Sequence, residues 1–342
     1  MITVFSADHE KRNVRTELYG GVLVPPHERA ERARIVLDRV QEVGLGDVVA
    51  PTRHGLDPVL KVHDAGLIEF LSTVEDEWAA AGYEGEAIPT CWPARRMVDR
   101  VPRHVDGKLG YYAMSTETSI GPGTWEAAQA SKDVALTAAA LVAGGEKGAF
   151  GLCRPPGHHA AYDLYGGYCF INNAAVAAQH LRDAGAGRVA ILDVDFHHGN
   201  GTQDIFYRRG DVFFASLHGD PADAFPHFMG YADEVGEGAG EGFTVNYPMP
   251  PGTAYDQWSD ALADALRRIR AFGAEAIVVS LGVDTFERDP ISFFKLTSDD
   301  FRRYGGLIGQ AGLPTLFLLE GGYAVAEVGI NAVNVLSGFE DA

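Results

Sequence analysis

Short apolar runs alternate with stretches of helical periodicity along most of this 342-residue chain. Apolar, β-branched runs are typical of strands buried on both faces, and apolar residues at helical spacing indicate amphipathic helices. The runs predict strands at residues 3–5, 48–50, 149–153, 188–193, 212–216, 276–281 and 315–319. The periodicity predicts helices at residues 28–43, 66–81, 127–143, 174–184, 255–272 and 298–311. We therefore expect a single α/β domain over residues 1–342, with three α/β/α layers and a mostly parallel central sheet.

One segment, at about residues 83–124, breaks this alternation. It is rich in Gly, Pro and charged residues and has little periodicity, but Trp92, Tyr111 and Tyr112 argue against disorder. An irregular segment of this length in a compact domain is usually functional. We expect an insertion here that serves the function of the domain.

Four of the predicted strands run directly into polar residues. Because the carboxyl ends of parallel strands meet at one edge of a sheet, and ligands bind there, we expect these segments to converge. The segments are Arg154-Pro155-Pro156-Gly157-His158-His159, Asp193-Val194-Asp195-Phe196-His197, Gly282-Val283-Asp284 and Glu320-Gly321-Gly322-Tyr323.

Three of these polar residues form a predicted metal site. Buried carboxylates are rare unless they are paired or bind a metal, and carboxylate oxygen with imidazole nitrogen suits Zn²⁺. Asp195, His197 and Asp284 would leave one position open, which is the mark of a catalytic site. Fe²⁺ or Co²⁺ fits the same donors. The alternative for either aspartate alone is a helix cap after a strand.

The histidine pair predicts proton transfer beside that metal. His158 and His159 follow a rigid Pro-Pro-Gly turn, and Asp193 and Asn200 are suitable acceptors for their ring N–H groups. Tyr323 follows two glycines and can place its hydroxyl near a developing oxyanion. Taken alone, the histidine pair reads as structural and the Gly-Gly-Tyr turn as a simple loop.

Charge and cysteine content narrow the class of partner. The formal net charge of −19 disfavours nucleic acid and anionic membranes and favours cationic ligands, although plain solubility explains it equally. Three sparse cysteines, Cys91, Cys153 and Cys169, fit a reducing compartment. The N-terminus has no signal-peptide pattern, and no apolar run is long enough to span a membrane. We expect a cytoplasmic protein.

Taken together, these segments resemble the arginase–deacetylase superfamily over residues 1 to about 338, and Gly166-Gly167-Tyr168-Cys169-Phe170-Ile171-Asn172-Asn173 adds to the likeness. Within it, the chain resembles the zinc-dependent histone-deacetylase-like amidohydrolases, most closely the bacterial acetylpolyamine amidohydrolases. The resemblance implies the arginase–deacetylase fold and one Zn²⁺ per chain. It implies metal ligands at Asp195, His197 and Asp284, a general acid–base pair at His158 and His159, and oxyanion stabilisation by Tyr323.

The resemblance also implies sites around this centre. Gly167, Tyr168 and Phe225 match the walls of a narrow acyl-lysine channel. A structural monovalent cation, usually K⁺, is implied at Asp193, Asp195, His197, Ser216 and Leu217. Asn200 departs from many eukaryotic relatives, which have aspartate there, and leaves open how the histidine pair divides its work.

Two glycines distinguish the chain from the binuclear manganese ureohydrolases of the same superfamily. Gly199 and Gly282 stand where arginase-like enzymes carry carboxylates for a second metal. One set of ligands is therefore retained and the other is missing, which favours a single zinc and an amide substrate.

The expected reaction is metal-assisted hydrolysis of an acetylated amine to acetate and a free amine. The first candidate substrates are acetylpolyamines, such as acetylputrescine, acetylcadaverine and acetylspermidine; the alternative is acetyl-lysine in proteins or peptides. In acetylpolyamine amidohydrolases a comparable insertion supports a homodimer and narrows the entrance. Asp106 and Glu117 in this segment can bind ammonium groups, or they are solvated or paired with nearby arginines. A metal-free module that binds acetylated amines is the remaining alternative.

Overall fold

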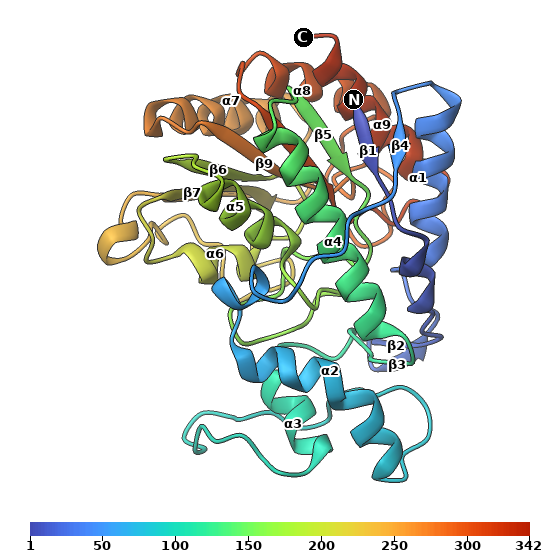
Figure 1. Ribbon diagram of the computed structural model, residues 1–342. Coiled ribbons are helices and arrows are strands. Elements are labelled where there is room, and N and C mark those ends of the chain that lie inside the picture. The colour runs from blue at the N-terminus through green and yellow to red at the C-terminus, as the bar shows by residue number, and fades with distance from the viewer.

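Eight parallel strands form one sheet at the centre of the computed structural model, which describes residues 1–342. The strand order is β4-β1-β5-β10-β9-β6-β7-β8 (Figure 1). The strands are β1 (Ile2–Val4), β4 (Val48–Val49), β5 (Gly148–Gly151), β6 (Val189–Asp193), β7 (Val212–Gly219), β8 (Thr244–Met249), β9 (Ala276–Leu281) and β10 (Thr315–Leu319). The predicted parallel α/β class is confirmed, and each strand predicted from the sequence is present.

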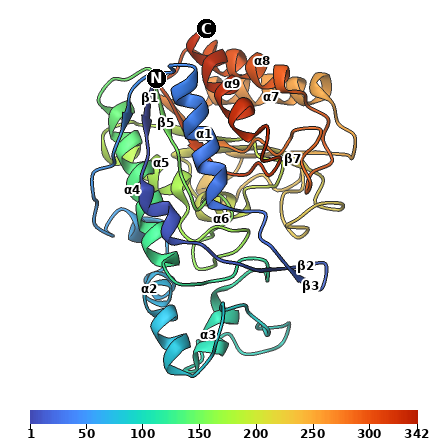
Figure 2. The same ribbon diagram turned by 90° about the vertical axis from the view of Figure 1, so that its right-hand side faces the viewer.

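Helices cover both faces of this sheet. One face is covered by α1 (Ala30–Glu42), α7 (Tyr255–Phe272), α8 (Ser298–Gly309) and α9 (Val328–Glu340), and the other by α4 (Thr124–Ala143), α5 (Asn173–Asp183) and α6 (Asn200–Phe206) (Figures 1 and 2). Alternate residues of β6 join opposite cores: Ile191 belongs to one apolar cluster, and Ala190 and Leu192 to the other. The three-layer prediction is therefore confirmed.

A smaller group of elements lies beyond the carboxyl edge of the sheet. It consists of α2 (Ala65–Ala80), α3 (Val105–Tyr112) and the antiparallel hairpin of β2 (Glu17–Tyr19) and β3 (Val22–Val24) (Figures 1 and 2). Lys108 on α3 pairs with Glu77 on α2, and the Trp92 indole donates to the Ala113 carbonyl at 2.8 Å. The segment 83–124 is thus ordered by a contact with α2 and by a hydrogen bond within the segment.

Several short elements escaped the sequence prediction. The strands β2, β3 and β8, and the helices α3, α6 and α9, were not expected. The hairpin strands have three residues each, and Asn246 and Pro248 interrupt the apolar pattern of β8. Packing against α8 and α1 stabilises α9 despite its glycine and β-branched content. No helix combines the length and the apolar character needed to cross a membrane.

A buried ion cluster fixes the start of α1. Glu28 was expected inside this helix, but it precedes it, and its carboxylate contacts three guanidinium groups. The closest distances are 3.1 Å to Arg12, 3.2 Å to Arg32 and 2.8 Å to Arg154, and all four side chains are almost fully buried. Burial opposes ionisation, but the guanidinium groups prevail and lower the pKa of Glu28 to about 2. The cluster therefore ties the N-terminal segment, α1 and the loop after β5 together.

Replacing Glu28 by Gln leaves buried arginines without their anion, and we expect it to cost about 3–5 kcal/mol of unfolding free energy at pH 7. Urea unfolding measures this change. Because the folded-state pKa is depressed, the stabilisation is present above the unfolded pKa of about 4.3 and is lost as pH falls toward 2. The control is Glu10→Gln, which removes an exposed pair with Arg34 and should leave stability unchanged. Equal effects of both substitutions would contradict the role of the cluster.

Candidate active site

The four polar segments singled out in the sequence follow four neighbouring strands. β5, β10, β9 and β6 are consecutive in the sheet and run in one direction, so the residues after them share one edge. The register places Asp193 opposite Ser280, four residues before Asp284. The topology therefore brings together residues that lie far apart in the sequence.

Asp195, His197 and Asp284 form the innermost group. One potential ligand atom from each lies within 4.8 Å of the others, and all three side chains are buried. His197 Nδ1 is 3.0 Å from Asp284 Oδ2 and 3.3 Å from Asp195 Oδ1. Main-chain amides hold the carboxylates: Phe196 donates to Asp284 Oδ1 at 2.7 Å, and Gly321 donates to Asp195 Oδ2 at 2.8 Å. The group is thus rigidly oriented around one point.

The donor set of this group fits one divalent metal. Burial and the neighbouring charge of Asp195 raise the pKa of Asp284 to about 8, so a cation is needed for both carboxylates to be ionised at neutral pH. Zinc, iron(II) and cobalt(II) all accept carboxylate and imidazole ligands. A side chain at Gly282 would put its Cβ 2.0 Å from Asp195 Oδ2, and one at Gly199 would put it 2.1 Å from Asp193 Oδ2. The backbone therefore leaves no room for further carboxylates at these two positions.

The two histidines lie side by side but have different partners. Their ring centroids are 4.0 Å apart. His158 Nδ1 is 2.9 Å from Asp193 Oδ2, whereas His159 Nδ1 is 2.7 Å from the amide oxygen of Asn200. Burial disfavours the charge of both rings. The carboxylates around His158 overcome that effect and raise its pKa to about 10, while burial and the charges of His158 and His197 lower the pKa of His159 well below its usual value. The two rings therefore differ in their affinity for a proton.

Tyr323 is held by residues that no pattern in the sequence singled out. The Asp289 carboxylate accepts the amides of Tyr323 at 2.7 Å and of Ala324 at 3.2 Å. The Arg32 guanidinium lies 4.8 Å from the centre of the Tyr323 ring and donates to the Gly322 carbonyl at 2.6 Å. Both partners come from distant parts of the chain, so only the fold reveals them.

A cavity of about 370 Å³ leads to this group. Its inner end is lined by His159, His197 and Tyr323, and its walls include Gly167, Tyr168 and Phe225. The hairpin β2–β3 contributes Tyr19 to its rim, together with Glu117 and Asp223. The lining contains neither lysine nor arginine. The cavity is thus aromatic along its walls and acidic at its rim.

The two acidic residues predicted to contact substrate lie in different places. Glu117 lines the cavity, where its Oε1 accepts the Gly167 amide at 3.0 Å and its Oε2 accepts no hydrogen bond from the chain. Asp106 lies in the first turn of α3 and is not part of the cavity lining of its own chain. Neither residue forms the alternative ion pairs with arginines of this segment. Of these two acidic residues, only Glu117 therefore lines the cavity of its own chain.

The residues expected around a monovalent cation lie beneath the histidine pair. Asp193 and Ser216 are directly opposite in the register of β6 and β7, and Leu217 is the next residue. All three are fully buried. Asp193 Oδ1 accepts the Asp195 amide at 3.1 Å, which joins this region to the segment 195–197.

Comparisons with known proteins agree with this geometry. A family model described as a histone deacetylase domain matches residues 26–339. The acetylpolyamine amidohydrolase of Mycoplana ramosa is 64% identical over 338 residues, which cover 99% of each chain. Acetylpolyamine amidohydrolase 2 of Pseudomonas aeruginosa is 54% identical over 340 residues, again 99% of each chain.

A solved structure shows the same fold. The crystal structure of an acetylpolyamine aminohydrolase from Burkholderia pseudomallei, from an iodide soak, has a TM-score of 0.94 at 40% identity, and the match covers 99% of this chain and 98% of that one. The HD domain of HDA15 matches with a TM-score of 0.82 at 25% identity. The resemblance inferred from the sequence is confirmed: the chain belongs to the histone deacetylase family and is a deacetylase.

Proposed function

We propose that this chain is a zinc-dependent amidohydrolase that removes the acetyl group from acetylated polyamines and releases acetate and the free amine. The observation that carries this proposal is the cavity, which joins an acidic rim free of lysine and arginine to the group of His159, His197 and Tyr323. The full-length acetylpolyamine amidohydrolase relatives support the same substrate class.

In this proposal Asp195, His197 and Asp284 hold one Zn²⁺. Bound there, zinc would supply a Lewis acid that polarises the acetyl carbonyl and favours ionisation of water. The chain's own contribution is to orient these ligands through main-chain amides, such as the 2.8 Å bond from Gly321 to Asp195. The buried pair of carboxylates supports a divalent ion at this point.

The histidine pair divides the proton transfers in this proposal. His159 lines the cavity, and because its Nδ1 bonds to the Asn200 oxygen, its other ring nitrogen is free to accept a proton from the attacking water. His158, beside Asp193, stays protonated and stabilises negative charge at the reaction centre. His159 then donates its proton to the leaving amine, so one residue acts as base and afterwards as acid.

Tyr323 completes the site by donating a hydrogen bond from its hydroxyl to the carbonyl oxygen as that oxygen gains negative charge. Burial raises the pKa of this phenol well above its usual value, so it remains a donor throughout the cycle. Asp289 and Arg32 fix its main chain, which means that little reorganisation is needed in the transition state.

The rim of the cavity supports a polyamine. Glu117 Oε2 has no partner within the chain and faces the route that a second ammonium group would take. Tyr19 and Tyr168 add aromatic faces for the same charge. Acetyl-lysine in a protein or peptide is a candidate because its acetylated side chain has the same shape. It ranks second because that side chain carries no second ammonium group.

A homodimer would complete this entrance. Met97, Val98 and Val101 are exposed apolar residues in the segment 83–124, and Phe228 is 92% exposed near the cavity. A second copy covering these residues would place its own segment 83–124, with Asp106, near the mouth. The exposure of these apolar side chains supports such an interface.

Two further features belong to the proposal. A structural K⁺ would be held by Asp193, Ser216 and Leu217, with the main-chain carbonyls of Asp195 and His197. The burial of these residues on adjoining strands supports it. A reducing, cytoplasmic location fits three free cysteines and no disulfide.

Replacing Tyr323 by Phe removes one hydroxyl and keeps the ring. Because that hydroxyl is the donor to the developing oxyanion, we expect turnover to fall by about 10²–10³-fold while zinc content is unchanged. Steady-state rates and metal analysis of the same preparation measure both. Unchanged turnover would remove the assigned role.

Gly282 tests the single metal site. In Gly282→Ala the added Cβ would meet Asp195 Oδ2 at 2.0 Å, so we expect zinc affinity to fall by about 10–100-fold, measured by chelator competition. Gly55→Ala is the matched control, because nothing lies within 4 Å of the Cβ there. Equal zinc affinity in both variants would exclude Asp195 as a ligand.

The substrate class is tested by one turnover assay that compares acetylputrescine, acetylcadaverine, acetylspermidine and an acetyl-lysine peptide. We expect kcat/KM for the best polyamine to exceed that for the peptide by at least about tenfold, which corresponds to about 1.4 kcal/mol. Faster hydrolysis of the peptide than of every polyamine would favour the second candidate.

Glu117→Gln should raise KM for a polyamine roughly two- to fivefold, as for a partly exposed ion pair, and should not change KM for an uncharged acetylated amine.

A further inference from the structure

Glu320 is a buried acid beside the active site that has no part in the proposed mechanism. It follows β10 directly, is 1% exposed and does not line the cavity. Its amide donates to the Leu281 carbonyl at 3.0 Å, and its carbonyl accepts from Arg32 at 2.7 Å. The base of this side chain is therefore fixed from both sides.

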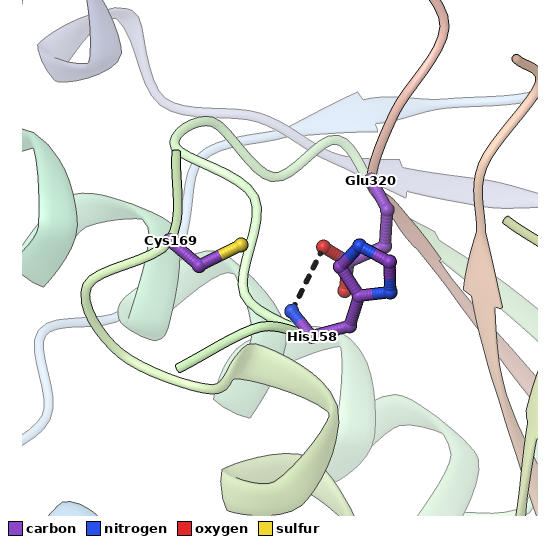
Figure 3. A group of neighbouring side chains, drawn as sticks. All are labelled: His158, Cys169 and Glu320. Atoms are coloured by element: carbon purple, nitrogen blue, oxygen red, sulfur yellow. Dashed lines mark hydrogen bonds between the residues drawn. The ribbon is translucent and has the colours of Figure 1, made fainter. Parts of the chain in front are cut away.

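The carboxylate of Glu320 reaches the loop that carries the histidine pair. Its Oε2 accepts the main-chain amide of Gly157 at 2.6 Å and that of His158 at 3.2 Å, as the dashed line to His158 in Figure 3 illustrates. Both donors are buried, and an unpaired buried amide costs about 1–3 kcal/mol. This oxygen therefore fixes the position of the main chain of His158.

The second oxygen of this carboxylate argues against a role in stability alone. Glu320 Oε1 is buried and has no hydrogen-bond partner, and burial raises the pKa of the group to about 7. A half-satisfied buried acid costs free energy, and a smaller neutral acceptor would bind the same amides without that cost. A cost of this kind beside an active site points to function.

We propose that Glu320 is a positioning residue for deacetylation, which holds the His158–His159 pair at a fixed distance from the strand end that carries Tyr323. Asp193 orients the ring of His158, and Glu320 fixes its main chain. The next residue, Gly321, contacts Asp195, so one strand end is tied to both halves of the site. This inference rests on the proposed function.

An alternative role for Glu320 is as a ligand in a second metal site, together with His158 and Cys169. His158, Cys169 and Glu320 each place a potential ligand atom within 4.8 Å of the others, and Figure 3 shows the Cys169 sulfur directed toward the Glu320 carboxylate. However, Cys169 Sγ donates to the Gly167 carbonyl at 3.3 Å, and burial raises the pKa of this thiol well above its usual value. Metals bind the thiolate, so the geometry favours the positioning role.

Two variants of the full-length holoenzyme test this role. Glu320→Ala removes the acceptor, and we expect kcat to fall by about 10²-fold because the histidine pair moves, with KM changed by less than about threefold. Glu320→Gln keeps an oxygen of the same reach, and we expect it to recover kcat to within about tenfold of the wild type. Steady-state kinetics with the best substrate gives both constants.

A matched control separates positioning from loss of fold. Glu75 also accepts main-chain amides, those of Gly123 and Thr124 at 3.0 Å each, at the start of α4 and away from the site. Glu75→Ala should lower the thermal midpoint but leave kcat per folded, metal-loaded chain unchanged. A second readout is the low-field proton signal of the His158 ring N–H bonded to Asp193, which should shift in Glu320→Ala and persist in Glu320→Gln.

Three outcomes would overturn the inference. The first is a Glu320→Ala variant with kcat within about threefold of the wild type, and the second is a Glu320→Gln variant that folds but is as inactive as Glu320→Ala. The third is a wild-type chain that binds two metal ions, one of which is lost in Glu320→Gln. A wild-type chain that hydrolyses no acetylated amine would instead overturn the proposed function. In that case the histidine signal still tests the contact between Glu320 and the loop.

Discussion

The burial of several ionisable groups at one edge of a parallel sheet is the constraint on which the rest of the site depends. Asp193, Asp195, Asp284 and Glu320 are all almost fully excluded from water at the ends of adjacent strands. Each buried carboxylate requires a cation or several hydrogen-bond donors. The structure meets that requirement with imidazoles, with main-chain amides and with the donor set for one divalent metal.

Each of three of these carboxylates accepts a hydrogen bond from a main-chain amide in a neighbouring loop. Asp284 accepts from Phe196, Asp195 from Gly321, and Glu320 from His158. The loops after β5, β6 and β10 are thus each held by a carboxylate that follows a different strand. Such cross-bracing costs little conformational freedom at the moment of reaction, because the donors are already aligned.

The two ends of the cavity use charge differently. At the inner end, low dielectric strengthens each electrostatic contact. Burial disfavours the charge of both rings, but the carboxylates of Asp193 and Asp195 raise the pKa of His158, whereas burial and the charges of His158 and His197 lower that of His159. At the rim, Glu117 is only partly buried, and its charge is better suited to attracting a cation than to chemistry. In the proposed function, the inner end would therefore carry out the reaction and the rim would select the amine.

The sequence by itself determined the parallel α/β class, the family and the identity of the innermost residues, because apolar strand runs and the polar residues that end them are local patterns. Short or irregular elements, such as α3 and the β2–β3 hairpin, could not be predicted, since their stability comes from contacts with distant segments. Only the tertiary structure decided that Asp289 and Arg32 hold Tyr323, that Asp106 lies outside its own chain's cavity, and that Glu320 reaches the histidine loop. These contacts join residues from different strands and loops, and no local pattern of residues encodes the distances between them.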